Sequence, residues 1–132
     1  IALTPDPFIV DETFSGHWRN DVPSGEGIVI QRIRNGMMLM YWMTYDADGN
    51  QRWIIAIGKR EGATIVADEV FITDNGVFAT LEEVEPDLIS VGELVVEFSG
   101  CDLGEVRYTV DGESGTMEIG RLTGLGSDEC TR

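Results

Sequence analysis

Basic residues are scarce in this chain. Its 132 residues include 9 Lys and Arg against 24 Asp and Glu, which gives a formal net charge of −15 at pH 7. The acids are scattered rather than gathered in one block, and such a chain repels nucleic acid and anionic membrane surfaces. We therefore expect neither partner. The charge itself is more typical of a solubility feature than of a binding site.

The sequence also lacks the usual signatures of membrane segments and of enzymes. No apolar run is long enough for a membrane helix, and no signal-peptide pattern is present, as in a chain that starts after the cleavage site. The single histidine, His17, lies near Ser15 and Asp21, but no G-x-S-x-G motif accompanies it. The glycines of Ser24-Gly25-Glu26-Gly27 precede no helical pattern, so a phosphate-binding loop is not expected. We expect no enzyme activity, no catalytic residue, no cofactor and no metal site.

Only two cysteines are present, Cys101 and Cys130. An even count in a glycine-rich β chain permits a disulfide, and closing this loop would stabilise the fold by roughly 3.5 kcal/mol. A bridge would indicate an oxidising compartment. Two buried free thiols are the alternative, and composition alone leaves both open.

The stretch Met37 to Ile57 is unusually apolar. It has two arms joined by the polar turn Asp46-Ala47-Asp48-Gly49-Asn50, and its aromatic and β-branched residues predict a long antiparallel hairpin. The turn resembles part of a calcium loop, but the Glu expected at the twelfth position is missing, which favours a plain hairpin turn. The first arm is apolar on both faces, whereas a strand with one solvated face alternates with polar residues. Something should therefore cover its second face, which carries Met37, Leu39, Tyr41 and Met43.

The remaining sequence predicts about eight or nine short strands separated by turn signals such as Asn35-Gly36 and Asp74-Asn75-Gly76. No segment has a helical pattern. We predict an all-β fold, an antiparallel β-barrel or barrel-like sandwich, over residues 14–132. Residues 1–13 differ in composition and form a predicted extension before this single domain.

Several motifs resemble a widespread bacterial exported β domain of unknown function. They are S-G-x-W at 15–18, S-G-E-G at 24–27, Y-W-x-T-Y-D-x-x-G at 41–49, Trp53, F-S-G-C-D-L-G at 98–104, and R-L-T at 121–123 followed by Cys130. This resemblance covers roughly residues 14–130. It implies an exported all-β domain and favours the Cys101–Cys130 disulfide, but it implies no activity.

The extension resembles the donor strands of extracellular fibril subunits, and the whole chain is similar to protomers of fibrils found in pond water. An extended apolar segment can complete the sheet of a neighbouring copy by β-augmentation. The expected donor residues are Ile1, Leu3, Phe8, Ile9 and Val10, and the expected acceptor is a cleft beside an open edge strand lined by Met37, Leu39, Tyr41 and Met43. The chain would then be a secreted structural subunit whose partner is itself. Alternatively, residues 8–13 are the chain's own first strand.

Exposed tryptophans offer a different function. Trp18, Trp42 and Trp53 could stack on sugar rings, which would make the protein a secreted, monomeric carbohydrate-binding module. Core packing is the more common fate of aromatic residues in strands. The fibre subunit is therefore the first hypothesis and glycan binding is the alternative.

Overall fold

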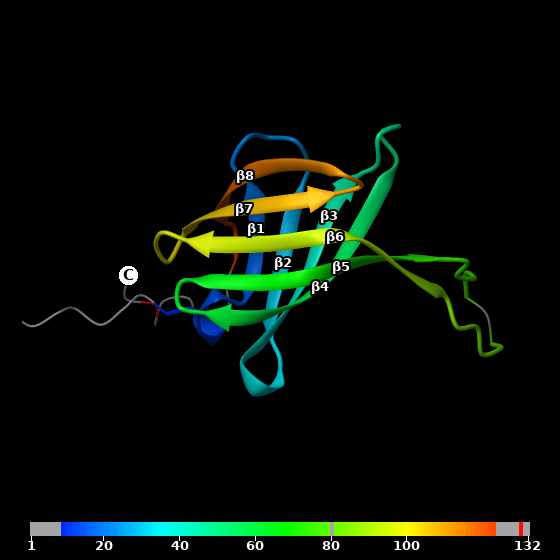
Figure 1. Ribbon diagram of the computed structural model, residues 1–132, viewed down its shortest axis with the longest axis horizontal. Coiled ribbons are helices and arrows are strands. Elements are labelled where there is room, and N and C mark those ends of the chain that lie inside the picture. Colours follow the sequence, from blue (N-terminus) through cyan, green and yellow to red (C-terminus); the bar gives the residue numbers. More distant parts are fainter. Residues whose placement is uncertain (1–8, 80, 124–129, 131–132) are drawn as a thin grey trace, which may run out of the picture.

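Eight antiparallel strands close into a barrel in the computed structural model, which describes residues 9–79, 81–123 and 130 (Figure 1). Each strand pairs with the next along the chain, and β8 returns to pair with β1. The elements are η1 Glu12–Phe14, β1 Gly16–Asn20, β2 Gly27–Arg32, η2 Arg34–Gly36, β3 Met37–Tyr45, β4 Gln51–Glu61, β5 Thr64–Asp74, β6 Asp87–Phe98, β7 Leu103–Val110 and β8 Glu113–Arg121. The predicted all-β antiparallel barrel is confirmed. Neither described helix is long and apolar enough to cross a membrane.

Side-chain alternation in β3 shows how the core forms. Met38, Met40 and Trp42 point inward and are buried, while the residues between them face outward. The other strands repeat this pattern, because successive side chains of a strand point to opposite faces. The buried apolar residues that fill the barrel are Val10, Phe14, Trp18, Ile28, Ile30, Met38, Met40, Trp42, Ile54, Ala56, Ile65, Ala67, Val70, Leu94, Val96, Phe98, Val106, Met117 and Ile119.

The up-and-down order gives the barrel two different ends. The turns β2–β3, β4–β5 and β6–β7 lie at one end, together with η1 and the end of β8; we call this the plug end. The connections β1–β2, β3–β4, β5–β6 and β7–β8 lie at the other end. The long β5–β6 connection projects from that end in Figure 1, and we call it the arm end.

An aromatic cluster closes the plug end. The rings of Phe14 and Phe98 are 4.6 Å apart, and those of Trp18 and Phe98 are 4.9 Å apart. The indole N–H of Trp18 donates to the carbonyl oxygen of Phe14 at 3.0 Å. Because a buried indole needs an acceptor, this hydrogen bond fixes η1 beneath the barrel.

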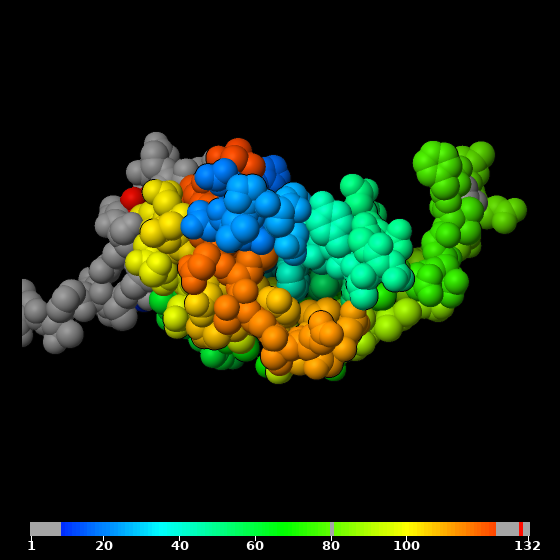
Figure 2. All heavy atoms as spheres, turned by 90° about the horizontal axis from the view of Figure 1, so that it is seen from above, coloured from blue at the N-terminus to red at the C-terminus, as the bar shows by residue number. Residues whose placement is uncertain are grey.

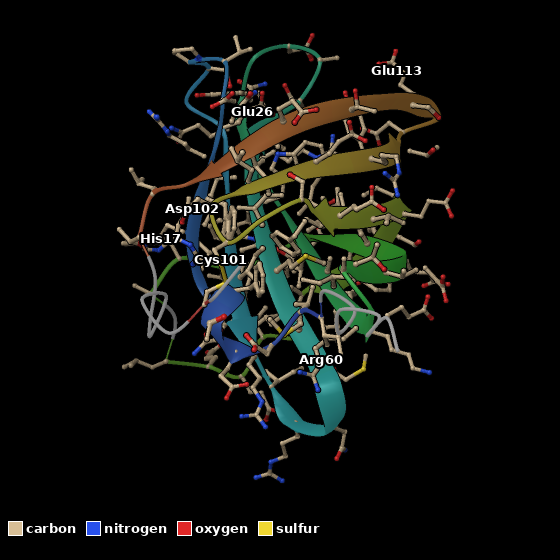
Figure 3. All side chains as sticks on the ribbon, turned by 90° about the vertical axis from the view of Figure 1, so that its left-hand side faces the viewer. His17, Glu26, Arg60, Cys101, Asp102 and Glu113 are labelled. Atoms are coloured by element: carbon tan, nitrogen blue, oxygen red, sulfur yellow. A yellow bond between two sulfur atoms is a disulfide. The ribbon has the colours of Figure 1, made fainter. Side chains whose placement is uncertain are left out.

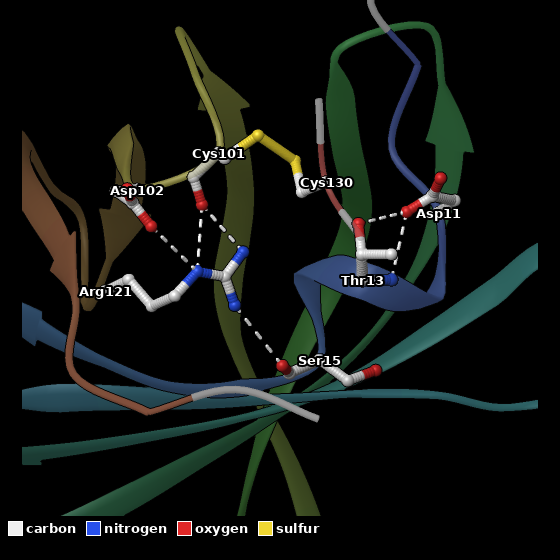
Figure 4. Close-up of a disulfide and its surroundings, with 7 residues drawn as sticks. All are labelled: Asp11, Thr13, Ser15, Cys101, Asp102, Arg121 and Cys130. Carbon is white, nitrogen blue, oxygen red and sulfur yellow. Dashed lines mark hydrogen bonds and ion pairs between the residues drawn. A yellow bond between two sulfur atoms is a disulfide. The ribbon is translucent and has the colours of Figure 1, made fainter. Parts of the chain in front are cut away.

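A buried arginine joins this cluster to the disulfide (Figure 4). The guanidinium of Arg121 lies 4.4 Å from the ring centroid of Trp18 and donates to the carbonyl oxygen of Cys101 at 2.7 and 2.9 Å. Cys101 is bonded to Cys130, so the disulfide favoured by the resemblance is confirmed. The bond ties residue 130 to the β6–β7 turn at the plug end.

The barrel includes residues that the sequence analysis assigned to the extension. Val10 is fully buried, its amide donates to the carbonyl oxygen of Gly62 at 2.8 Å, and its carbonyl accepts from Arg60 at 3.2 Å. Thr13 is also buried. The packed region therefore begins at Val10, a few residues before the boundary predicted after residue 13.

Strands β5 and β6 extend beyond the end of the barrel. Their ladder continues to Asp74 and Asp87, and residues 73–79 and 81–90, which we call the arm, project from the barrel (Figure 1). Register shifts in β5 between Ala67 and Phe71 mark bulges, which bend a strand and increase its twist. At Gly92 in β6 a Cβ would overlap the carbonyl oxygen of Thr109, so the chain needs glycine there. The arm departs just beyond these irregularities.

Candidate functional site

Where the arm departs, the barrel wall is incomplete. The β4–β5 ladder begins at Ile55, so residues 51–54 of β4 pair only with β3. Likewise the β6–β7 ladder begins at Gly92, so residues 87–90 of β6 pair only with β5, and the carbonyl oxygen of Val91 accepts from the amide of Asp111 at 2.9 Å. The arm end thus retains a free strand edge on β4, and unpaired strand edges are templates for pairing with another chain.

A cleft of about 450 Å³ lies beside this free edge, and we call it the mouth cleft. Figure 2 shows the β3–β4 hairpin in turquoise and the β7–β8 hairpin in orange on either side of a hollow. The lining residues are Glu26, Trp42, Thr44, Tyr45, Asp46, Ala47, Arg52, Ile54, Tyr108, Val110, Asp111 and Glu113. Trp42 and Tyr108 form an aromatic floor, and their ring centroids lie 5.1 Å apart.

Charged side chains form the rim of the mouth cleft. Arg52 and Asp111 form an ion pair at 2.6 Å between the β3–β4 and β7–β8 hairpins. The hydroxyl of Thr44 donates to Glu26 at 2.6 Å. Figure 3 places Glu26 and Glu113 toward the arm end and Arg60 toward the β2–β3 turn.

Two buried donors in the mouth cleft have no partner within the described part of the chain. They are the indole N–H of Trp42 and the Nε–H of Arg52. A buried donor without an acceptor costs roughly 1–3 kcal/mol.

The ion pair across the cleft sets the ionisation of Asp111. A hydrogen bond from Arg52, together with its charge, holds the pKa of the Asp111 carboxyl below its ordinary value. The pair therefore stabilises the fold above that ordinary pKa, and its contribution is lost as the pH falls through the lowered value. The effect on stability is small, because the Asp111 side chain is half-exposed.

We expect the substitution Arg52→Gln to raise the pKa of Asp111 toward the ordinary value of about 3.9, because the charged donor is lost. An NMR titration of the Asp111 carboxyl carbon measures this directly. The control Arg107→Gln removes an arginine paired with Glu97 and Glu105 instead and should leave Asp111 unchanged. Equal pKa values for Asp111 in the wild type and Arg52→Gln would contradict the ion pair.

Only one of the three tryptophans expected to stack on sugars has an exposed ring. Trp18 is 1% exposed and Trp42 is 5% exposed, so both belong to the core. Their prediction as surface stacking residues is wrong, because inward positions of β1 and β3 bury them. Trp53 is 55% exposed and lies beside Met43 and Tyr45 around a shallow groove of about 340 Å³.

The expected donor residues have different fates. Val10 is buried in its own barrel, so its assignment to a segment given to another copy is wrong. Ile9 is exposed and is not part of any strand. Ile1, Leu3 and Phe8 lie outside the described residues.

The expected acceptor is corrected as well. Met37, Leu39, Tyr41 and Met43 do lie on one face of β3, but β3 pairs with β4 along its whole length and with β2 from Met38 to Met43, so it has no open edge beside them. These side chains face outward. Together with Tyr45, Trp53, Ile55 and Ile57 they form an apolar surface on the outside of β3 and β4, which we call the wall.

The remaining candidates, the Asp46–Asn50 turn and His17, make contacts within the fold. The Asp46–Asn50 turn is held by its own hydrogen bonds from the amides of Asp48 and Asn50 to Asp46. His17 contacts the Thr123 hydroxyl at 3.0 Å. Among residues 9–79, 81–123 and 130, no group of three or more His, Cys, Asp or Glu could hold a metal ion.

Sequence reasoning missed the mouth cleft and the arm. It predicted strands at residues 63–73, 77–81 and 88–98. The structure has no strand at 77–79 or 81, and the shift of register between β4 and β5 was not predicted. One signal was present: the large apolar residues at 77–89 lie among acids and turn residues, which is unusual for a core strand.

Comparison with known proteins adds no relative: no family model, no curated protein and no solved structure matches this chain.

Proposed function

We propose that this protein is a structural subunit of an extracellular fibre. Copies join head to tail when residues 1–8 of one copy add as a strand in the mouth cleft of the next. The observation that carries the proposal is the free β4 edge at residues 51–54, beside a cleft with an aromatic floor and a charged rim. β-Augmentation needs this combination of an open edge and side-chain pockets.

The chemistry of residues 1–8 suits this cleft. Ile1, Leu3 and Phe8 would each contribute about 1.5–3 kcal/mol on full burial. Ordering eight residues costs roughly 8–16 kcal/mol of backbone entropy, so burial of these side chains alone is insufficient. Ladder hydrogen bonds to the free edge of β4 supply the remaining stabilisation.

The positions of donor and acceptor favour an open polymer. Val10 binds the β4–β5 turn, so the chain enters the barrel at the plug end, whereas the mouth cleft lies at the arm end. A contact between two different ends of identical subunits is heterologous, and repeated copies extend as a fibre when the rotation does not close.

The disulfide is compatible with a location outside the cell. Disulfides persist in oxidising compartments, and the Cys101–Cys130 bond lies at the plug end, where the packed chain begins at Val10.

Deleting residues 1–8 should abolish filaments without unfolding the barrel. The barrel persists because Val10 keeps its hydrogen bond to Gly62 and its place in the core. Negative-stain microscopy detects filaments, and circular dichroism shows whether the barrel is folded. Filaments of unchanged form from the truncated chain would overturn the proposal.

A peptide control sharpens this test. The peptide IALTPDPF should bind the truncated protein with a saturable change in fluorescence, because Trp42 lines the mouth cleft. A scrambled peptide of the same composition should not bind comparably. Equal responses to both peptides would show that apolar content alone, rather than a strand-shaped fit, accounts for binding.

Glycan binding is the second candidate, supported by the exposed ring of Trp53 beside Tyr45. Flat aromatic faces stack on sugars, but a single exposed tryptophan gives a small platform. A monomeric protein whose fluorescence responds saturably to a glycan, and loses the response in Trp53→Ala, would favour this function over the fibre.

A further inference from the structure

The arm exposes an unusual amount of apolar surface. Phe78 is 97% exposed, and its neighbours on the arm are also open to solvent. The exposed apolar residues of the arm are Val77, Phe78, Leu81, Val84, Leu88 and Ile89. Single exposed apolar side chains are ordinary, but a cluster on a projecting ribbon marks an interaction surface.

The arm is also strongly acidic. It carries Asp74, Glu82, Glu83, Glu85 and Asp87 and no basic residue. Indeed the sequence contains no Lys or Arg between Arg60 and Arg107. An anionic membrane surface would repel this arm, so a complementary partner combines apolar side chains with basic ones.

The wall has that combination. Across strands β3 and β4, Met43 pairs with Trp53, Tyr41 with Ile55 and Leu39 with Ile57, and all six side chains face outward. The elements β2, η2, β3 and β4 carry only one acid, Glu61, against five basic residues. These are Arg32, Arg34, Arg52, Lys59 and Arg60. Arg32, Arg34, Lys59 and Arg60 lie toward the plug end. Lys59 shares the outward face of β4, whereas Arg52 and Arg60 lie on its inner face, where Arg52 pairs with Asp111 and Arg60 donates to Val10.

We propose that the arm of one copy docks on the wall of a second copy. Apolar residues of the arm pack on the outward side chains of β3 and β4, and its acids approach the basic residues at the plug end of that wall. The inference rests on the proposed assembly of copies, and it adds a contact that does not use residues 1–8.

The two contacts are geometrically compatible. The arm and the mouth cleft share one end of the barrel, while the start of the packed chain and the basic end of the wall share the other. Bringing the plug end of one copy to the arm end of another therefore allows both contacts at a single junction. The arm projects away from its own barrel in Figure 1, which leaves its tip to reach a neighbour.

Substitutions in the arm of the full-length chain test the proposal through assembly. The double variant Phe78→Ser/Leu81→Ser should raise the protein concentration needed for filaments at least about ten-fold, since buried interface anchors typically carry that much affinity. Val22→Ser is the matched control, because Val22 is 69% exposed on the β1–β2 loop, outside both arm and wall. Equal concentrations for all three proteins would overturn the arm contact while leaving the fibre proposal intact.

Charge exchange tests the direction of the contact. Glu83→Lys/Glu85→Lys on the arm and Arg34→Glu/Lys59→Glu on the wall should each weaken assembly, and equimolar mixing of the two variants should restore part of it. Mixing that restores nothing, while both variants remain folded, would count against this pairing of surfaces.

Cross-linking separates the two proposals. Full-length Phe78→Cys mixed with Ile57→Cys under mild oxidation should form a linkage between residues 78 and 57, identified by mass spectrometry, in several-fold excess over Phe78→Cys mixed with Val22→Cys. If the chain makes no filaments yet this linkage forms, the fibre function fails and the arm–wall contact stands. Equal yields from the two mixtures would overturn the contact.

Discussion

Replacing Trp18 with alanine should lower the free energy of unfolding by about 3–5 kcal/mol, the range for a large aromatic residue removed from a core. Trp18 sits between Phe14, Phe98 and the guanidinium of Arg121. The substitution leaves a cavity at the plug end and deletes the hydrogen bond that holds η1. Both effects act in the same direction, so we expect the loss near the upper part of that range.

Urea unfolding followed by far-ultraviolet circular dichroism measures this loss independently of tryptophan fluorescence. Trp53→Ala is the matched control, since it removes the same atoms from an exposed position and should change stability by less than about 1 kcal/mol. If Trp18→Ala does not fold, Trp18→Phe replaces it and should still lose more stability than Trp53→Ala. Similar losses at positions 18 and 53 would contradict the buried role of Trp18.

The sequence predicts most of the barrel because strand alternation and turn residues are local signals. The hairpin over residues 37–57 is found where its apolar arms and its Asp/Gly/Asn turn predict it. Asn35, in the Asn35-Gly36 turn, has the positive φ that favours asparagine and glycine. The apolar residues on the second face of β3 face outward and form the wall, and the expectation that something covers this face stays a prediction.

The site could not be predicted in the same way, because it depends on registers between strands far apart in sequence. Nothing local in Gln51–Ile54 reveals that β5 bends away and leaves this edge unpaired. Likewise Val10 resembles its neighbours in the extension, and only its hydrogen bond to the β4–β5 turn separates it from them. Bulges are tertiary features as much as local ones, so a one-residue shift decides where the barrel ends and the arm begins.

Removing the disulfide should lower the free energy of unfolding by roughly 3.5 kcal/mol, the loop-closure contribution expected for two cysteines this far apart in sequence. The bond closes a loop that contains β7 and β8, so the unfolded chain gains much freedom when the bond opens. The carbonyl oxygen of Cys101 also accepts two hydrogen bonds from Arg121, which lies over Trp18. Loss of the bond should therefore loosen the plug end first.

Urea unfolding with and without reductant measures this contribution. The control is Cys101→Ala/Cys130→Ala, whose unfolding midpoint should be low and insensitive to reductant. A wild-type midpoint that reductant leaves unchanged, with loss of the bond verified by mass, would contradict the prediction. A loss of 3.5 kcal/mol corresponds to an about 300-fold lower ratio of folded to unfolded protein. In a reducing compartment the barrel would thus lose much of its stability margin, which links the bond to the proposed extracellular role.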